Sequence, residues 1–101
     1  MNTVEAENII YELLLSDKSL PVRVRSKLSW DEAEFNELLD AVDFLIDAWA
    51  ESKTVPKFIA LAFVDIYSVF NLKDGFYPSE KLNFLEDMGI TLQEKASELF
   101  S

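Results

Sequence analysis

Residues 29–52 read SWDEAEFNELLDAVDFLIDAWAES, and the spacing of their apolar side chains decides the fold class. At 100° per residue, these side chains fall in an arc of about 120°, which is the pattern of an amphipathic helix packed on one side. Ser29 and Glu32 match a capping box, so we expect the helix to begin there and to end near Ser52. Seven apolar residues form the stripe: Phe35, Leu38, Leu39, Val42, Leu45, Ile46 and Trp49.

The next segment, at about residues 55–70, is apolar on almost every side. Thr54 can cap a helix over it, and Pro56 is tolerated in the first helical turn. A helix of this kind is usually buried, so we expect it to be the central element of a bundle. Asp65 interrupts the run. Because a buried carboxylate is costly unless it is paired, we expect Asp65 at the rim of the surface or in a structural pair, rather than in a functional site.

Capping signals outline the N-terminal part of the chain. Asn2 with Glu5, or Thr3 alone, can cap a first helix that reaches about Leu15. Residues 20–28 fit either a short helix capped by Ser19 or an edge strand. We favour the helix because the chain contains no second strand-like run with which such a strand could pair.

Similar signals divide the C-terminal part into two helices. Pro78 opens a helix that we expect to reach about Met88. Gly89 is placed to end it as a C-terminal glycine cap. Thr91 and Glu94 form a second capping-box pattern, which predicts a separate last helix.

These segments predict an all-α fold, a compact single-domain bundle of five or six helices over residues 1–101 with a central apolar helix at about 55–70. The length of 101 residues suits one domain, and a hydrophobic content of 50% suits a packed core. The chain has neither a basic leader nor an apolar run of about 20 residues. We therefore expect a soluble, cytoplasmic protein without membrane contact.

The composition removes several kinds of chemistry. There is no cysteine and no histidine, so disulfides, thiolate nucleophiles and the commonest general base and metal ligand are excluded. Gly75 and Gly89 are the only glycines and stand alone, so no glycine-rich phosphate loop exists. We expect no enzyme activity, no catalytic residue, no metal site and no cofactor.

The charge balance points to the class of partner. Nineteen acidic residues against nine basic ones give a net charge of −10. Such a field repels nucleic acid and anionic membranes, and it attracts basic proteins. We expect the main basic segment to lie near the acidic helices and to lower self-repulsion rather than to bind phosphate. This segment holds four of the nine bases: Lys18, Arg23, Arg25 and Lys27.

The placement of the acids is more specific than their number, because residues 28–51 contain eight acids and no base. Neighbouring like charges on a helix repel one another, so a cationic surface facing them would be favourable. We call the acids on the outer side of this helix the acidic stripe. Phe44 lies at the edge of the acidic stripe, and aromatic anchors dominate binding energies. The alternative is a solvated face, with Phe44 covered by a neighbouring helix. The candidate partner-binding residues are Glu37, Asp40, Asp43, Phe44, Asp47 and Glu51.

These features favour an acidic module that binds and neutralises a basic protein partner. Immunity proteins and antitoxins, which inhibit bacterial toxins or nucleases, provide an analogy of class and not of fold. An inhibitor that mimics nucleic acid is a variant of this hypothesis. The alternative is a self-associating structural or regulatory domain, in which Phe44, Trp30 or exposed parts of the 57–70 helix form a symmetric interface.

Overall fold

A computed structural model describes all residues from 1 to 101 and confirms the all-α bundle, with no strand. Six α-helices follow one another, and a π-helical turn, η1, directly extends the first. The elements are α1 (Thr3–Ile10), η1 (Tyr11–Leu15), α2 (Leu20–Arg25), α3 (Glu32–Ala48), α4 (Lys57–Ala62), α5 (Ile66–Phe70) and α6 (Ser79–Leu99).

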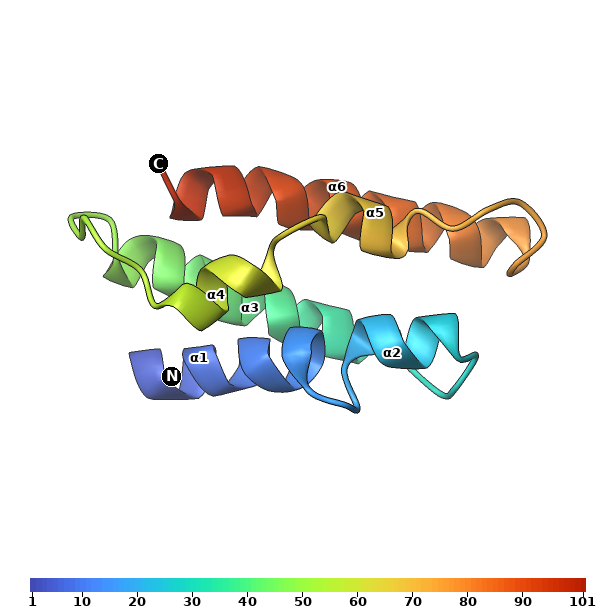
Figure 1. Ribbon diagram of the computed structural model, residues 1–101, viewed down its shortest axis with the longest axis horizontal. Coiled ribbons are helices and arrows are strands. Elements are labelled where there is room, and N and C mark those ends of the chain that lie inside the picture. Colours follow the sequence, from blue (N-terminus) through green and yellow to red (C-terminus); the bar gives the residue numbers. More distant parts are fainter.

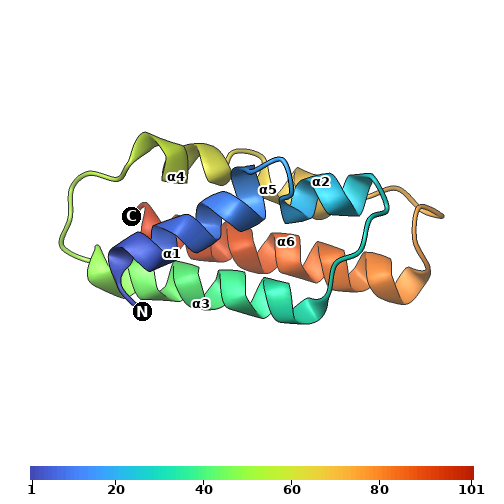
Figure 2. The ribbon, with the colours of Figure 1, turned by 90° about the horizontal axis from the view of Figure 1, so that it is seen from below.

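The helices form four rods that lie along the longest axis of a 43 × 22 × 20 Å molecule (Figures 1 and 2). Two rods are broken, α1–η1–α2 and α4–α5, and the chain runs along both in the same direction. The other two, α3 and α6, are continuous and run the opposite way. The packing partners close a ring, because α1 contacts α3, α3 contacts α6, α6 contacts α5, and α4 contacts η1. The α3 rod and the α4–α5 rod therefore occupy opposite corners of the bundle.

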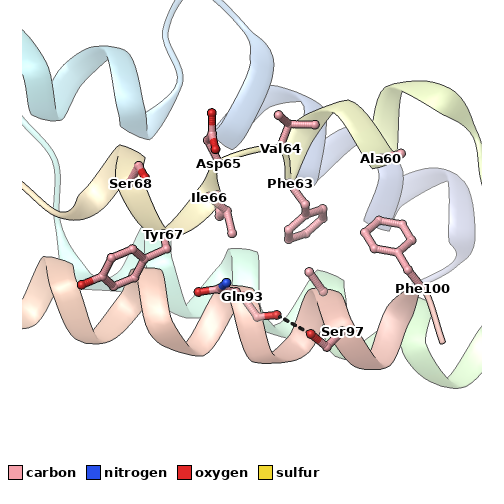
Figure 3. A pocket seen from close by; sticks show the side chains of 11 residues that line it. Ala60, Phe63, Val64, Asp65, Ile66, Tyr67, Ser68, Gln93, Ser97 and Phe100 are labelled. Carbon is pink, nitrogen blue, oxygen red and sulfur yellow. Dashed lines mark hydrogen bonds between the residues drawn. The ribbon is translucent and has the colours of Figure 1, made fainter.

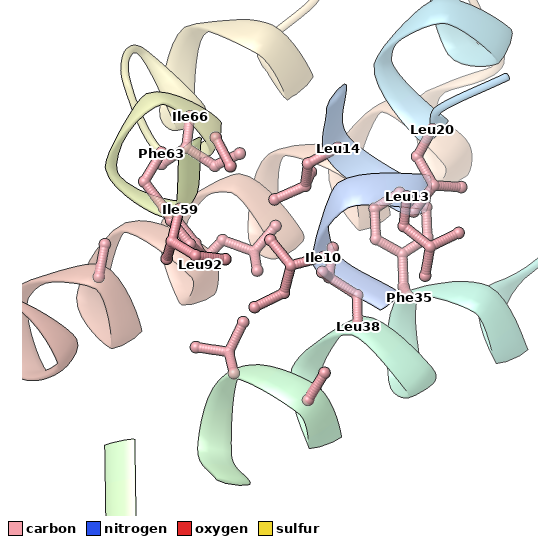
Figure 4. Packing of buried hydrophobic residues seen from close by; sticks show 14 of the residues in the cluster. Ile10, Leu13, Leu14, Leu20, Phe35, Leu38, Ile59, Phe63, Ile66 and Leu92 are labelled. Carbon is pink, nitrogen blue, oxygen red and sulfur yellow. The ribbon is translucent and has the colours of Figure 1, made fainter. Parts of the chain in front are cut away.

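Twenty buried apolar residues fill the space between the rods (Figure 4). At the end where α3 and α6 begin, an aromatic cluster completes this core. Phe35 is fully buried, and its ring centroid lies 5.3 Å from that of Phe70 and 5.4 Å from that of Phe84. Trp30 stacks on Phe84 at 6.0 Å, while the Tyr77 hydroxyl donates a 2.6 Å hydrogen bond to the carbonyl of Val24. Together these contacts join the loops at this end and all four rods.

The predictions for the N-terminal rod are confirmed. The Asn2 side chain accepts a hydrogen bond from the Glu5 amide and caps α1. Residues 20–25 are helical, with the Ser19 hydroxyl accepting from the Val22 amide and with Pro21 in the first turn. The helix ends in a Schellman motif: Lys27 adopts a left-handed conformation, and the Leu28 amide donates to the carbonyl of Arg23.

The start of α3 differs from the prediction by two residues. Asp31, not Ser29, is the N-cap, and Glu34, not Glu32, completes the capping box. Both pairs have the same spacing, so the sequence pattern alone did not separate them. In the observed register Glu34 also forms an ion pair with Arg23.

The prediction of one central helix at about 55–70 is wrong in two respects. The segment is divided into α4 and α5, and Asp65 between them has a positive φ of 56°. Thr54 does not cap it, since the helix begins after Pro56. The segment is also not enclosed, because the side chains of Leu61 and Val64 are each 62% exposed. Asp65 is exposed, which agrees with the expectation that it lies at the rim of the surface.

Gly89 does not end a helix, and Thr91 does not start one, because α6 continues through both. The glycine instead allows close packing of α6 on α5. A Cβ atom at Gly89 would lie 3.2 Å from the carbonyl oxygen of Tyr67 and 3.4 Å from Cβ of Phe70. Contact with another rod, rather than a turn, explains this glycine.

Candidate partner-binding surface

The outer side of α3 carries the predicted acidic stripe. Glu37, Asp40, Asp43, Asp47 and Glu51 are all exposed. The first four belong to α3, and Glu51 follows in the turn after it. The inner side of α3 holds its five buried residues, so the amphipathic pattern orients the acids outward.

Only one acid of this stripe has a basic partner. Asp43 forms an ion pair with Lys95 of α6, with 2.6 Å between Nζ and Oδ1. In the whole chain only Glu34 is paired as well, among nineteen acids. Asp40 and Asp47, which flank Asp43 on the same helix, form no ion pair. The stripe therefore has little internal charge compensation.

The adjacent helix α6 extends the acidic surface. The Asp43–Lys95 contact fixes which side of α6 faces the stripe. At 100° per residue, Glu98 lies within about 60° of Lys95 on that side. Glu94 and Glu98 are both exposed. The acidic surface thus spans two neighbouring helices rather than one.

Phe44 is half-buried and packs against the hydrophobic core. The alternative that neighbouring elements cover it therefore holds in part. Its exposed part borders Asp40 and Asp47 along the helix, which are four and three positions away. Phe44 can contribute only this edge to a partner.

Arg23 of the basic segment lies against the acidic helix, as we expected for this segment. Both terminal nitrogens of Arg23 donate to the two carboxylate oxygens of Glu34, at 2.9 and 2.6 Å. This hydrogen bonding lowers the pKa of the Glu34 carboxyl. Arg23 also donates to the carbonyls of Lys18 and Ser29. The arginine thus fixes the loop before α3, and it is not free to bind phosphate.

A small pocket at the start of α3 was not singled out from the sequence as a site. It has a volume of about 340 Å³, and three of its six lining residues are acidic. Lys81 places its Nζ 5.4 Å from the centroid of the Trp30 ring, so a cation already occupies one aromatic wall. Its signal in the sequence is weak, because the lining comes from segments about 50 positions apart. The lining residues are Trp30, Asp31, Glu32, Glu80, Lys81 and Phe84.

A larger groove of about 540 Å³ lies between α6 and the break in the α4–α5 rod (Figure 3). The rings of Phe63 and Phe100 meet edge to face at 5.9 Å at one end. At the other end the Tyr67 hydroxyl donates to Glu86 at 2.9 Å, and this hydrogen bond raises the pKa of the phenol. The groove contains no group of acidic residues arranged to hold a metal ion, and neither does the rest of the chain.

A scan against protein-family models and searches of curated proteins and solved structures find no match to this chain. No helix combines the length and the apolar character needed to cross a membrane.

Proposed function

We propose that this protein is an acidic binding module that docks a basic protein through the outer surface of α3, and that it acts as an inhibitor of that partner. One observation carries the proposal: Asp40 and Asp47 are exposed and unpaired on either side of Asp43. Like charges spaced along one helix destabilise it by a few tenths of a kcal/mol per pair. A cationic partner would offset this repulsion, because its positive charges attract the same carboxylates.

Two further features support a protein partner. The net charge of −10 would steer a basic protein towards the surface and speed association. The edge of Phe44 supplies an apolar contact within the charged area. Acidic inhibitors of basic toxins or nucleases, of the immunity-protein or antitoxin kind, are the functional class to which this combination is best suited.

The test begins with affinity capture from a lysate of the source cells, with elution by a salt gradient. A basic polypeptide retained in stoichiometric amount is then purified, and its affinity for the module is measured by calorimetry at several salt concentrations. We expect the affinity to fall steeply with salt, because the contact is electrostatic.

The variant Asp40→Asn/Asp43→Asn/Asp47→Asn locates the binding surface. We expect it to weaken binding at least tenfold. The matched control Glu12→Gln/Asp17→Asn/Asp74→Asn makes the same change in net charge at three other exposed acids. Equal weakening by both triple variants would mean that net charge, and not the α3 surface, controls binding. Unchanged affinity in the α3 variant would refute the proposal.

A further inference from the structure

The corner of the bundle opposite α3 has an apolar surface that no other element covers. Phe58, Leu61 and Val64 are 37%, 62% and 62% exposed, and we call these three residues the α4 apolar face. Tyr11, 46% exposed, extends this face, and its ring lies edge to face with Phe58 at 6.5 Å. Contiguous exposed apolar side chains of this kind mark an interaction site more often than isolated ones do.

The residues of this face surround Leu61 in a regular pattern. Within α4, Lys57 and Phe58 both fall within about 60° of Leu61 at 100° per residue. The chain leaves the α-helix after Ala62, but the Phe63 and Val64 amides still donate to carbonyls three residues earlier. Val64 and Asp65 both point away from α6 in Figure 3. One outward stripe therefore carries a base at one end, an acid at the other and apolar side chains between them.

This order of residues is complementary to itself. If a second copy of α4 lies antiparallel against the first, with the two-fold axis beside Leu61, the start of each α4 lies against the end of the other. Leu61 then faces Leu61 of the second copy, and Phe58 lies towards Val64 of that copy. Lys57 lies towards Asp65 of the second copy, so the symmetric contact brings opposite charges together twice. A parallel arrangement would instead place Lys57 beside Lys57.

The charge distribution also favours a second copy over a basic partner at this corner. Residues 52–64 contain two lysines and no acid, in a chain whose net charge is −10. A basic protein finds no attraction in this segment. Two copies that meet here direct their acidic α3 corners away from each other, because α3 and α4–α5 lie diagonally in the bundle.

We propose that the protein forms a two-fold symmetric homodimer through antiparallel packing of α4, centred on Leu61. The interface is limited to one short helix and Tyr11, so it lies at the small end of specific interfaces, and the dimer is weak and concentration-dependent. This inference does not depend on the proposed function, since the acidic surface on α3 remains free in the dimer.

Site-specific crosslinking tests the symmetry axis directly. The chain has no cysteine, so Leu61→Cys introduces a single thiol in each copy. Facing helices at an axial separation of about 8–10 Å place the two Cβ atoms within disulfide reach. The matched control is Leu28→Cys, because Leu28 is also an exposed leucine, at 56%, but lies outside α4. Under mild oxidation at about 100 μM protein, we expect covalent dimer from Leu61→Cys at least fivefold faster than from Leu28→Cys.

Sedimentation equilibrium of the cysteine-free protein gives the dissociation constant. It is measured in about 0.3 M salt, where screening reduces repulsion between the acidic copies. We expect Leu61→Lys to weaken dimerisation at least tenfold, whereas Leu28→Lys leaves it unchanged. We also expect Lys57→Glu to weaken it at least threefold more than Lys53→Glu, which changes the net charge equally outside the paired positions.

Two results would overturn the inference. The first is a monomer at all concentrations up to about 500 μM, which would leave the α4 apolar face to a different partner. The second is a dimer that is equally sensitive to Leu28→Lys and Leu61→Lys, which would place the interface elsewhere. Neither result bears on capture of a basic partner by α3, so this inference and the proposed function fail separately.

Discussion

The α3 corner and the α4–α5 corner arise from two apolar segments of similar length, but they differ in continuity and in surface. In α3 the apolar residues form one stripe, and the helix is unbroken over 17 residues. In α4–α5 apolar residues occur all round, and the rod breaks at Asp65. The first corner presents acids to solvent, and the second presents Leu61 and Val64.

This difference shows what hydrophobic patterning determines. An apolar stripe determines which side of a helix is buried, and a polar opposite face leaves no other side that could be buried. A segment that is apolar all round has more apolar surface than one corner of a four-rod bundle can cover. The surplus stays exposed, and it becomes available for a partner.

The largest effect should come from comparing one aromatic residue from each of the two corners. Phe35 of α3 is fully buried against Phe70 and Phe84, so we expect Phe35→Ala to lower the free energy of unfolding by about 3–5 kcal/mol. Phe58 of α4 is 37% exposed, and we expect Phe58→Ala to cost about 1 kcal/mol. Urea denaturation measures both. Equal losses would mean that the α4 corner is packed as tightly as the α3 corner.

The fold was predictable where local signals agreed. The all-α class and the long α3 follow from periodicity and caps. The helix within residues 20–28 was favoured because Ser19 could cap it and no second strand was present to pair with it. The break at Asp65 and the continuity of α6 through Gly89 were not predictable from the sequence, because both depend on which rod packs against the segment. A glycine that admits the backbone of α5 has the same local sequence signal as a glycine that caps a helix.

Some features of the candidate site were likewise predictable from the sequence, and others were not. Exposure of the acids at α3 follows from their position opposite the apolar stripe, and the sequence was sufficient to predict it. The partial covering of Phe44 and the pairing of Asp43 with Lys95 were not predictable, because they depend on neighbouring rods. The α4 apolar face was expected to be buried, and only the packing exposes it.

The second prediction concerns how the two kinds of rod meet at Gly89. A valine there would place atoms against the Tyr67 carbonyl, which a Cβ alone already approaches to 3.2 Å. We expect Gly89→Val to lower stability by about 1–3 kcal/mol, because α5 must move away from α6. Asn83→Val is the control for the intrinsic cost of valine on an exposed position of α6. A loss in Gly89→Val no larger than that in Asn83→Val would show that close packing on α5 does not explain the glycine.

The third prediction tests whether Asp65 determines the break in the α4–α5 rod. Its left-handed backbone is unfavourable for residues with a Cβ, although Asp and Asn adopt it more readily than most. We expect Asp65→Ala to cost about 0.5–1 kcal/mol and Asp65→Asn to be nearly neutral. Thermal unfolding and far-UV circular dichroism follow both. If alanine instead raised helix content and stability, the rod would be continuous by preference, and the contrast with α3 would depend on one residue.

The smallest expected effect separates a paired acid of α3 from an unpaired one, and it depends on pH. The pKa of Glu34 is lowered by its hydrogen bonds from Arg23, so the folded state binds this proton less readily than the unfolded state does. Its stabilising contribution is therefore present above the ordinary value of 4.5 and is lost as the pH falls through the lowered pKa. We expect Glu34→Gln to cost about 0.5 kcal/mol at pH 7, since the pair is partly solvated, and less at pH 3.

Glu37→Gln is the matched control, with the same change of charge three positions further along α3. Glu37 has no basic partner, so removing its charge relieves repulsion within the acidic stripe and should leave stability unchanged or slightly higher at pH 7. Urea denaturation at pH 7 and pH 3 gives both differences. If Glu37→Gln were as destabilising as Glu34→Gln, the stripe would have compensation within the fold, and the reason to expect a cationic partner at α3 would be lost.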